Sequence, residues 1–197
     1  MGGPLASLGS AMRQPDVARL FLAVWPDAAA RAQLVAYRDG WRWPPGARPV
    51  TDDKLHLTLH FIGDFDRARI AALAGALAPV AMLPTVLRAD RPEVWRGGIA
   101  VLRLRADAHL SALHAALGEI LRAEGIDLDP RPFAPHVTLA RRARGGAAPV
   151  EPAAFAWPVH GFTLVESVRA PSARYEVIAS FGGDAGPALE RGGVTPA

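Results

Sequence analysis

The stretch Leu55-His56-Leu57-Thr58-Leu59-His60-Phe61-Ile62 holds the first of two copies of a short pattern. The copies are His56-Leu57-Thr58-Leu59 and His136-Val137-Thr138-Leu139, and they lie 80 residues apart (136 minus 56). Each follows a loop containing proline and shows the two-residue alternation typical of a β-strand, in which successive side chains point to opposite faces. Each copy is therefore predicted to present an imidazole and a hydroxyl side by side on the face that does not pack in the core.

Strict alternation divides the first copy and its flanks into two faces. Leu55, Leu57, Leu59 and Phe61 fall on the core face, and His56, Thr58, His60 and Ile62 fall on the other. Phe61 is thus predicted to be a packing residue, and His60 is predicted to lie on the same face as His56, at the rim of the site. In the second copy Val137 and Leu139 are expected in the core.

Further strands and helices are predicted on both sides of the two copies. Strands are expected over 20–25, 55–62, 85–89, 99–105, 136–140, 162–168 and 175–181, the last two as a hairpin around Pro171-Ser172. Helices are expected over 27–37, 66–77 and 107–124, with Asp27 and Asp107 as N-caps and with Pro79 and Gly125 as stop signals. The segments 41–49 and 130–135 are expected to be loops. Strand pairs mixed with helices favour an α+β fold with antiparallel sheets.

Length and composition limit the classes to which the protein can belong. Half of the 197 residues are hydrophobic, which suits one domain or a domain of two similar lobes. We predict a flexible leader over 1–17, the domain over 18–184 and a flexible tail over 185–197. The chain has no cysteine, which excludes disulfides and thiolate chemistry. The longest uncharged apolar stretch, 70–83, is too short to cross a membrane, so a cytoplasmic protein is predicted.

The net charge is only +3, but the sequence pI is about 10.1 because nearly all the basic residues are arginines. Arginine presents a planar fork that matches phosphate oxygens. A GC-rich genome produces the same bias, so only an individual arginine in a particular place indicates function.

A pair of imidazoles suits the cleavage of a phosphodiester. One group must activate the attacking hydroxyl or water, another must protonate the leaving oxygen, and histidine serves both purposes because its pKa lies near neutrality. The two histidines must approach phosphorus from opposite sides, since the attacking and leaving oxygens lie roughly in line. Threonine hydroxyls can donate hydrogen bonds to the other phosphate oxygens. This chemistry requires no metal and no cofactor.

The duplicated pattern resembles the signature of the two-histidine phosphoesterase superfamily, His-x-Thr-x-x followed by a hydrophobic residue or arginine, repeated in two lobes. Within it the chain is similar to the RNA 2′,3′-cyclic phosphodiesterases, historically called 2′-5′ RNA ligases. The resemblance covers about residues 19–182. Its four ordered matches are Arg19-Leu20-Phe21-Leu22-Ala23, the two His-x-Thr segments extended to Gly63 and to Arg141, and the closing segments Leu164-Val165-Glu166-Ser167 and Tyr175-Glu176-Val177-Ile178.

This resemblance implies a bilobal fold with two antiparallel sheets facing a central cleft and helices packed outside. It also implies roles: His56 as proton donor, His136 as proton acceptor, and Thr58, Thr138 and Arg141 as ligands of the substrate phosphate. Strict alternation places Arg141 on the face opposite His136, so a bulge or the strand's end must turn it inward. The implied partner is RNA ending in a 2′,3′-cyclic phosphate, hydrolysed to a 2′-phosphomonoester.

Alternative functions can be weighed from the same residues. Reversible 2′-5′ RNA ligation would use the same in-line geometry as hydrolysis. It ranks second, because water at high concentration favours hydrolysis over ligation. A non-catalytic protein that binds RNA ends or nucleotides would be expected to lack one of the histidines. A zinc site built from His56 and His60 requires a helix, whereas the leucine alternation indicates a strand.

Several other side chains are candidates for lesser roles. Trp41, Trp43, Trp95 and Phe133 are candidates for base stacking or for packing. Arg131 is a candidate for substrate binding. His109 and His114 lie on the third predicted helix and are expected to be a surface residue and a packing residue. A monomer is expected, because one chain supplies both lobes of the cleft.

Overall fold

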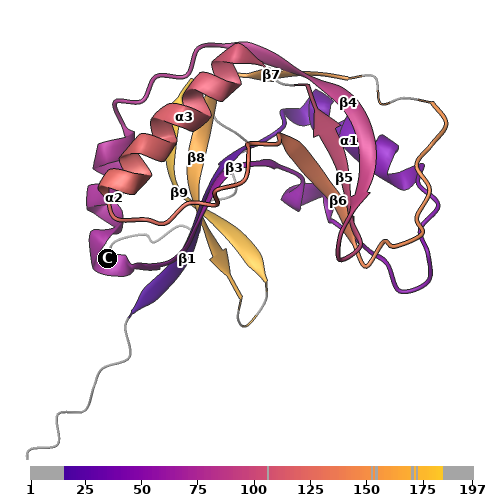
Figure 1. Cartoon of the computed structure of the whole chain (residues 1–197), viewed down its shortest axis with the longest axis horizontal. Coiled ribbons are helices and arrows are strands. Elements are labelled where there is room, and N and C mark those ends of the chain that lie inside the picture. Colours follow the sequence, from indigo (N-terminus) through magenta and orange to yellow (C-terminus); the bar gives the residue numbers. More distant parts are fainter. Residues whose placement is uncertain are drawn as a thin grey trace, which may run out of the picture.

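The computed structural model describes residues 16–183 except Ala106, Pro152, Ala154, Ala170 and Ser172. Apart from Asp16 and Val17, which opens the first strand, the predicted leader over 1–17 and tail over 185–197 lie outside the described residues. The described part holds an antiparallel β-sheet with helices packed against it (Figure 1).

The strands are β1 (Val17–Val24), β2 (Arg48–Pro49), β3 (Leu57–Asp66), β4 (Thr85–Trp95), β5 (Ile99–Leu104), β6 (His136–Arg141), β7 (Ala156–Val159), β8 (Gly161–Val168) and β9 (Arg174–Gly182). Their order in the sheet is β7-β4-β5-β6-β3-β1-β8-β9, and β2 pairs with β6 beside this path. Each recorded strand pair is antiparallel.

The sheet consists of two halves that meet between β3 and β6. One half contains β3, β1, β8 and β9, the other contains β6, β5, β4 and β7, and a single residue pair, Leu57 with Val137, joins them. In Figure 1, α2 and α3 cover the first half and α1 lies with the second. The expected α+β fold of two lobes is therefore confirmed, with the two antiparallel sheets continuous at their junction.

The first and third predicted helices begin where the sequence places them, whereas the helix expected from residue 66 begins only at Ile70, after a 3₁₀ turn. Asp27 caps α1 (Ala28–Asp39) by accepting a hydrogen bond from the backbone N–H of Ala30, at 2.7 Å. Asp107 caps α3 (Ala108–Ala123) in the same way, and Gly125 follows that helix with a positive φ of 77°, which a side chain would disfavour. The remaining helices are α2 (Ile70–Leu77) and the 3₁₀ turns η1 (Asp52–Lys54) and η2 (Arg67–Arg69).

The sequence did not predict β7, β2 or the second half of β4. Pro158 interrupts β7 and Pro92 interrupts β4, and proline removes a hydrogen-bond donor that a central strand needs. β7 is an edge strand, and over Pro92–Trp95 β4 pairs only with β5, so both prolines are tolerated there.

The core lies between the sheet and its helices, where alternate residues of β1 such as Leu20, Leu22 and Val24 are buried. A second, smaller cluster lies on the opposite face of the same strands and contains Phe21, Ala23, Trp25 and Val165. Because both faces of β1 are covered, this strand reads as a nearly continuous apolar run. The smaller cluster supports the side chain of His56.

Candidate active site

The two His-x-Thr segments lie side by side at the junction of the two halves. His56 immediately precedes β3, and His136 is the first residue of β6. Leu57 faces Val137 across an antiparallel pair, and continuing this register sets His56 against Thr138 and Thr58 against His136. Segments 80 residues apart (136 minus 56) therefore form one site with approximate two-fold symmetry.

In the first segment, a β-bulge follows the threonine. Thr58 and His60 pair with consecutive residues of β1, so Leu59 is an extra residue in β3. The extra residue reverses the alternation beyond it. His60 then points to the core side, where it is only 7% exposed, and Phe61 points to the site side, where it is 50% exposed.

The predicted faces of His60 and Phe61 are therefore wrong, although His60 still lines a cavity together with Thr58 and His136. Strict alternation placed His60 at the rim of the site and Phe61 in the core, and the bulge exchanges their faces. The guanidinium of Arg19 lies 4.5 Å from the centroid of the Phe61 ring.

The second segment contains the equivalent bulge. Thr138 and Ala140 pair with consecutive residues of β5, so Leu139 is the extra residue. Ala140 is fully buried, and Arg141 then falls on the same face as Thr138. The sequence required a bulge or the strand's end to turn Arg141 inward, and the bulge is present. In both segments the fifth residue after the histidine, Phe61 or Arg141, thus belongs to the face that carries the imidazole.

The hydrogen bonds of His56 define its tautomer. Its Nδ1 lies 2.7 Å from the carbonyl oxygen of Lys54, which can only accept, so Nδ1 carries the hydrogen. In the neutral ring Nε2 is then an acceptor, and it lies 3.1 Å from Oγ1 of Thr58. The hydroxyl of Thr58 therefore donates to Nε2 of His56.

Aromatic rings surround His56. The ring centroids of Phe21, Trp25 and Tyr175 lie 5.2, 5.1 and 5.4 Å from that of the imidazole. The indole N–H of Trp25 donates to Thr163 at 2.9 Å, which fixes one of these rings. The sequence singled out neither Trp25 nor Tyr175 for this site. The alternation of Tyr175 and Val177 in β9 was the available signal, since both pack on the smaller cluster beside His56.

His136 is held by the same kind of bond but has different neighbours. Its Nδ1 donates to the carbonyl oxygen of Ala134 at 2.8 Å, which leaves Nε2 as the acceptor of the neutral ring. The Trp95 ring lies 4.4 Å from the imidazole between ring centroids, and its N–H donates to Glu93 at 2.5 Å. Arg103, directly across the β5–β6 pair from His136, reaches Glu93 at 3.6 Å. Trp95 was a candidate from the sequence, whereas Glu93 and Arg103 were missed.

The surroundings of both imidazoles disfavour the protonated, charged form of the ring. Burial lowers the pKa of His56 to about 4; the Lys54 carbonyl opposes this shift, and the charges of His136 and Arg141 add to it. Burial also lowers the pKa of His136, with Arg103 lowering it further and the Ala134 carbonyl and Glu93 raising it. The same positive charge of Arg141 acts on the pKa of Tyr175, so its guanidinium lies near both rings. An anion bound among these groups would oppose the unfavourable charge.

A cavity of about 350 Å³ extends from this site toward α3. Its lining includes Thr58, Phe61, Trp95, Phe133 and His136. Arg131 also borders the cavity, but its guanidinium is bound to the carboxylate of Asp129 within the same loop. Trp41 and Trp43 stack on each other at 4.8 Å between ring centroids; Trp41 is buried and Trp43 packs against the core, so these two are packing residues.

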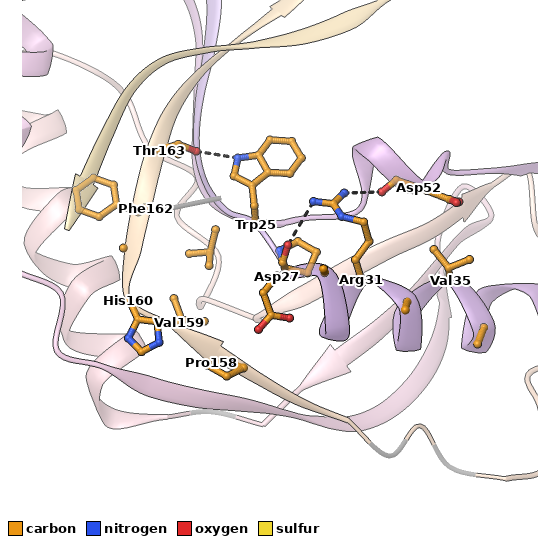
Figure 2. Close-up of a pocket in the computed structure, with 16 residues that line it drawn as sticks. Trp25, Asp27, Arg31, Val35, Asp52, Pro158, Val159, His160, Phe162 and Thr163 are labelled. Atoms are coloured by element: carbon orange, nitrogen blue, oxygen red, sulfur yellow. Dashed lines mark hydrogen bonds between the residues drawn. The ribbon is translucent and has the colours of Figure 1, made fainter. Parts of the chain in front are cut away.

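A larger cavity, of about 870 Å³, lies beside α1 and the junction of β7 with β8 (Figure 2). Trp25 is common to this cavity and to the ring cluster around His56. Figure 2 shows Arg31 along its wall, hydrogen-bonded to the backbone carbonyls of Pro26 and Asp52. Neither His56 nor His136 lines the larger cavity. The paired histidines, and not the size of a cavity, identify the candidate site.

Within the described residues, no group of three or more histidine, aspartate or glutamate side chains is arranged to hold a metal ion. None of the helices in that part of the chain is long and apolar enough to cross a membrane.

The curled antiparallel sheet and its two equivalent His-x-Thr segments are those of the two-histidine phosphoesterase class. A solved structure described as a phosphoesterase matches with a TM-score of 0.75 and 30% identity, over 86% of this chain and 98% of that one. The model of the 2′-5′ RNA ligase superfamily matches residues 25–171, and the chain belongs to that family. The resemblance noted in the sequence is confirmed.

Curated relatives are named by their activity. The RNA 2′,3′-cyclic phosphodiesterase of Thermus thermophilus is 32% identical over 182 residues, which cover 83% of this chain and 89% of that protein. The Escherichia coli protein of the same name is 33% identical over 160 residues, covering 79% and 89%. The crystal structure of E. coli LigT complexed with 3′-AMP matches with a TM-score of 0.74 and 30% identity, over 85% of this chain and 98% of that one.

Proposed function

We propose that this protein hydrolyses the 2′,3′-cyclic phosphate of RNA or nucleotides to a 2′-phosphomonoester, with His56 and His136 as the acid and base. One observation carries the proposal. Two imidazoles, each oriented by an Nδ1–H bond to a carbonyl two residues earlier, offer their Nε2 atoms to one site from adjacent strands. Relatives named RNA 2′,3′-cyclic phosphodiesterase, at about one-third identity, support the same reaction.

In the proposed reaction His136 takes a proton from water, and the oxygen of that water attacks phosphorus. The bond between phosphorus and the ribose O3′ breaks on the opposite side, and His56 donates its Nε2 proton to O3′. The product carries its phosphate on O2′. The assignment of donor and acceptor follows the family resemblance, since the two rings are held by equivalent bonds.

Thr58, Thr138 and Arg141 stabilise the charge of the phosphate in this proposal. The hydroxyl of Thr58 already lies 3.1 Å from Nε2 of His56, within reach of an oxygen bound beside that nitrogen. Arg141 supplies a full positive charge near His56, and this charge helps to lower the pKa of the imidazole. When the phosphate is bound, its negative charge opposes that of Arg141, so the pKa of His56 rises and the ring can hold the proton that it donates.

The base of the terminal nucleotide is proposed to stack on Phe61. This ring is 50% exposed and borders the 350 Å³ cavity with Trp95 and Phe133. Stacking on an aromatic ring tolerates any base, which suits an enzyme that acts on RNA ends of different sequence. The proposed partner is thus RNA with a 2′,3′-cyclic phosphate end, and the proposed form of the protein is a cytoplasmic monomer.

The test is product identification. Purified protein in EDTA is incubated with adenosine 2′,3′-cyclic phosphate, and the products are separated by chromatography that resolves 2′-AMP from 3′-AMP. The proposal predicts 2′-AMP, formed at the same rate with and without EDTA. Formation of 3′-AMP would overturn the direction of ring opening, and complete inhibition by EDTA would identify a metal enzyme. In a parallel incubation with RNA ends in place of the nucleotide, joining of those ends without release of 2′-phosphate would favour the ligase.

A further inference from the structure

The carbonyl that orients His56 and the carbonyl that orients His136 are held by different means. The carbonyl of Lys54 belongs to η1, where the Lys54 N–H donates to Thr51 at 2.9 Å. Arg38 also holds this turn, because its guanidinium donates to the Asp52 carboxylate at 2.7 Å and to the carbonyl oxygen of Val50 at 2.5 Å. The acceptor for His56 is therefore part of a hydrogen-bonded turn.

The carbonyl of Ala134 has no such turn. It lies in the segment 126–135, which the structure describes throughout and which contains neither helix nor strand. On one side of Ala134, the carbonyl of Pro135 accepts from the N–H of Leu104 in β5 at 2.9 Å. On its other side stands Phe133.

Phe133 is the last of three stacked rings, which form a column in the order His60, His114, Phe133 and begin at the buried His60. The Phe133 ring lies 3.9 Å from that of His114, between centroids, with the planes 15° apart. His114 in turn lies 3.9 Å from His60, with the planes 20° apart. His60 is placed there by the bulge in β3, and its Nε2–H donates to the backbone carbonyl of His114 at 2.8 Å.

The column also fits closely against α3. A Cβ added at Gly118 would lie 3.4 Å from the His60 ring, an ordinary van der Waals distance, so the ring lies directly beside this part of the helix. Burial lowers the pKa of His60, and burial with the neighbouring His60 and Arg122 lowers the pKa of His114 to about 4. The rings of His60 and His114 are therefore uncharged at neutral pH and stack without repulsion.

We propose that His60, His114 and Phe133 are positioning residues for His136: their stacked rings brace Phe133 and thereby fix the Ala134 carbonyl that orients the imidazole. The Leu104–Pro135 hydrogen bond holds the segment on one side, and the ring column holds it on the other. Stacking on one side thus replaces the hydrogen-bonded turn that serves His56. This inference rests on the proposed function, in which His136 exchanges a proton with the attacking water.

The test compares His114→Ala with His114→Phe in the full-length protein. The alanine variant removes the middle ring, whereas phenylalanine keeps a flat ring that cannot titrate. We expect His114→Ala to lower kcat about 10- to 100-fold, the loss that follows from an imidazole misplaced by about 1 Å, with KM changed less than about threefold. We expect His114→Phe to restore kcat to within about threefold of the wild-type value. His109→Ala, on the exposed side of the same helix, is the matched control and should retain wild-type kinetics.

A second measurement follows His136 directly and does not depend on turnover. In nitrogen-15 NMR spectra, the hydrogen-bonded Nδ1–H of His136 should give one sharp signal in the wild type and in His114→Phe. It should broaden or disappear in His114→Ala, at temperatures where thermal unfolding shows the variant to be folded.

Three results would overturn the inference: wild-type kcat in His114→Ala, a rise in KM alone, or a phenylalanine variant as impaired as the alanine one. His114 borders the 350 Å³ cavity, so a rise in KM alone would mean that its ring acts on substrate binding and not on the position of His136. An inactive wild-type protein would instead refute the proposed function, while the NMR comparison would still test the column.

Discussion

Acidification should destabilise the protein through His56, by an amount that follows from its environment. Folding encloses this imidazole among Phe21, Trp25 and Tyr175 and lowers its pKa from 6.5 to about 4. Between these values the unfolded chain takes up a proton that the folded chain does not. The free energy of unfolding therefore falls as the pH falls from 6.5 to 4. For a single group with these two pKa values the loss between pH 7 and pH 4 is about 3 kcal/mol.

A difference measurement isolates this contribution from the protein's other titrating groups. We would measure unfolding in urea at pH 7, 6, 5 and 4 for the wild type and for His56→Gln, whose side chain does not titrate. His114, whose pKa is also lowered to about 4, titrates in both proteins and cancels in the difference. The stability of the wild type relative to the variant should fall by about 3 kcal/mol from pH 7 to pH 4. A constant difference across this range would refute the reasoning, because it would mean that His56 titrates alike in the folded and unfolded chains.

Three further predictions concern catalysis. Arg141→Gln should lower kcat/KM about tenfold or more and should raise the pKa of His56, measured by NMR titration, because a positive charge beside both the phosphate and the imidazole is lost. Arg142→Gln is the matched control, and equal effects in both variants would show that Arg141 is not part of the site. Phe61→Ala should raise KM for adenosine 2′,3′-cyclic phosphate roughly tenfold while kcat changes little, because stacking of a base on an aromatic ring contributes about 1–3 kcal/mol to binding. An unchanged KM would mean that the base does not stack on Phe61. The pH profile of kcat/KM should reach its maximum below pH 6.5 and fall as the pH rises further, since one of the two histidines must hold a proton and burial lowers the pKa of both; a maximum near pH 8 would contradict these pKa shifts.

The sequence predicted the parts of the fold that depend on local signals. Asp27 and Asp107 each precede a run of helix-forming residues, and each caps the helix that follows it. The duplicated His-x-Thr segments predicted two equivalent strands, and these strands are neighbours in the sheet. Periodicity and capping are properties of a short segment, so one sequence is enough to recognise them.

The sequence could not predict features that depend on the pairing of distant strands. A bulge is a mismatch in count between a strand and its partner, and alternation within one strand does not reveal it. The bulges at Leu59 and Leu139 exchange the faces of His60 and Phe61 and turn Arg141 toward the site. In the same way, Tyr175 lies 119 residues after His56 (175 minus 56), and only the assembled sheet brings the two together.

The central claim is that His56 and His136 act as one acid–base pair, and single alanine variants test it most directly. Turnover of adenosine 2′,3′-cyclic phosphate in EDTA would be measured for the wild type, His56→Ala, His136→Ala and the double variant, with thermal unfolding as the control for folding. Each single variant should lose about 10²- to 10⁴-fold in kcat. The double variant should lose little more than either one, because the effects of residues that act as a unit are not additive. Wild-type activity in both single variants would contradict the claim.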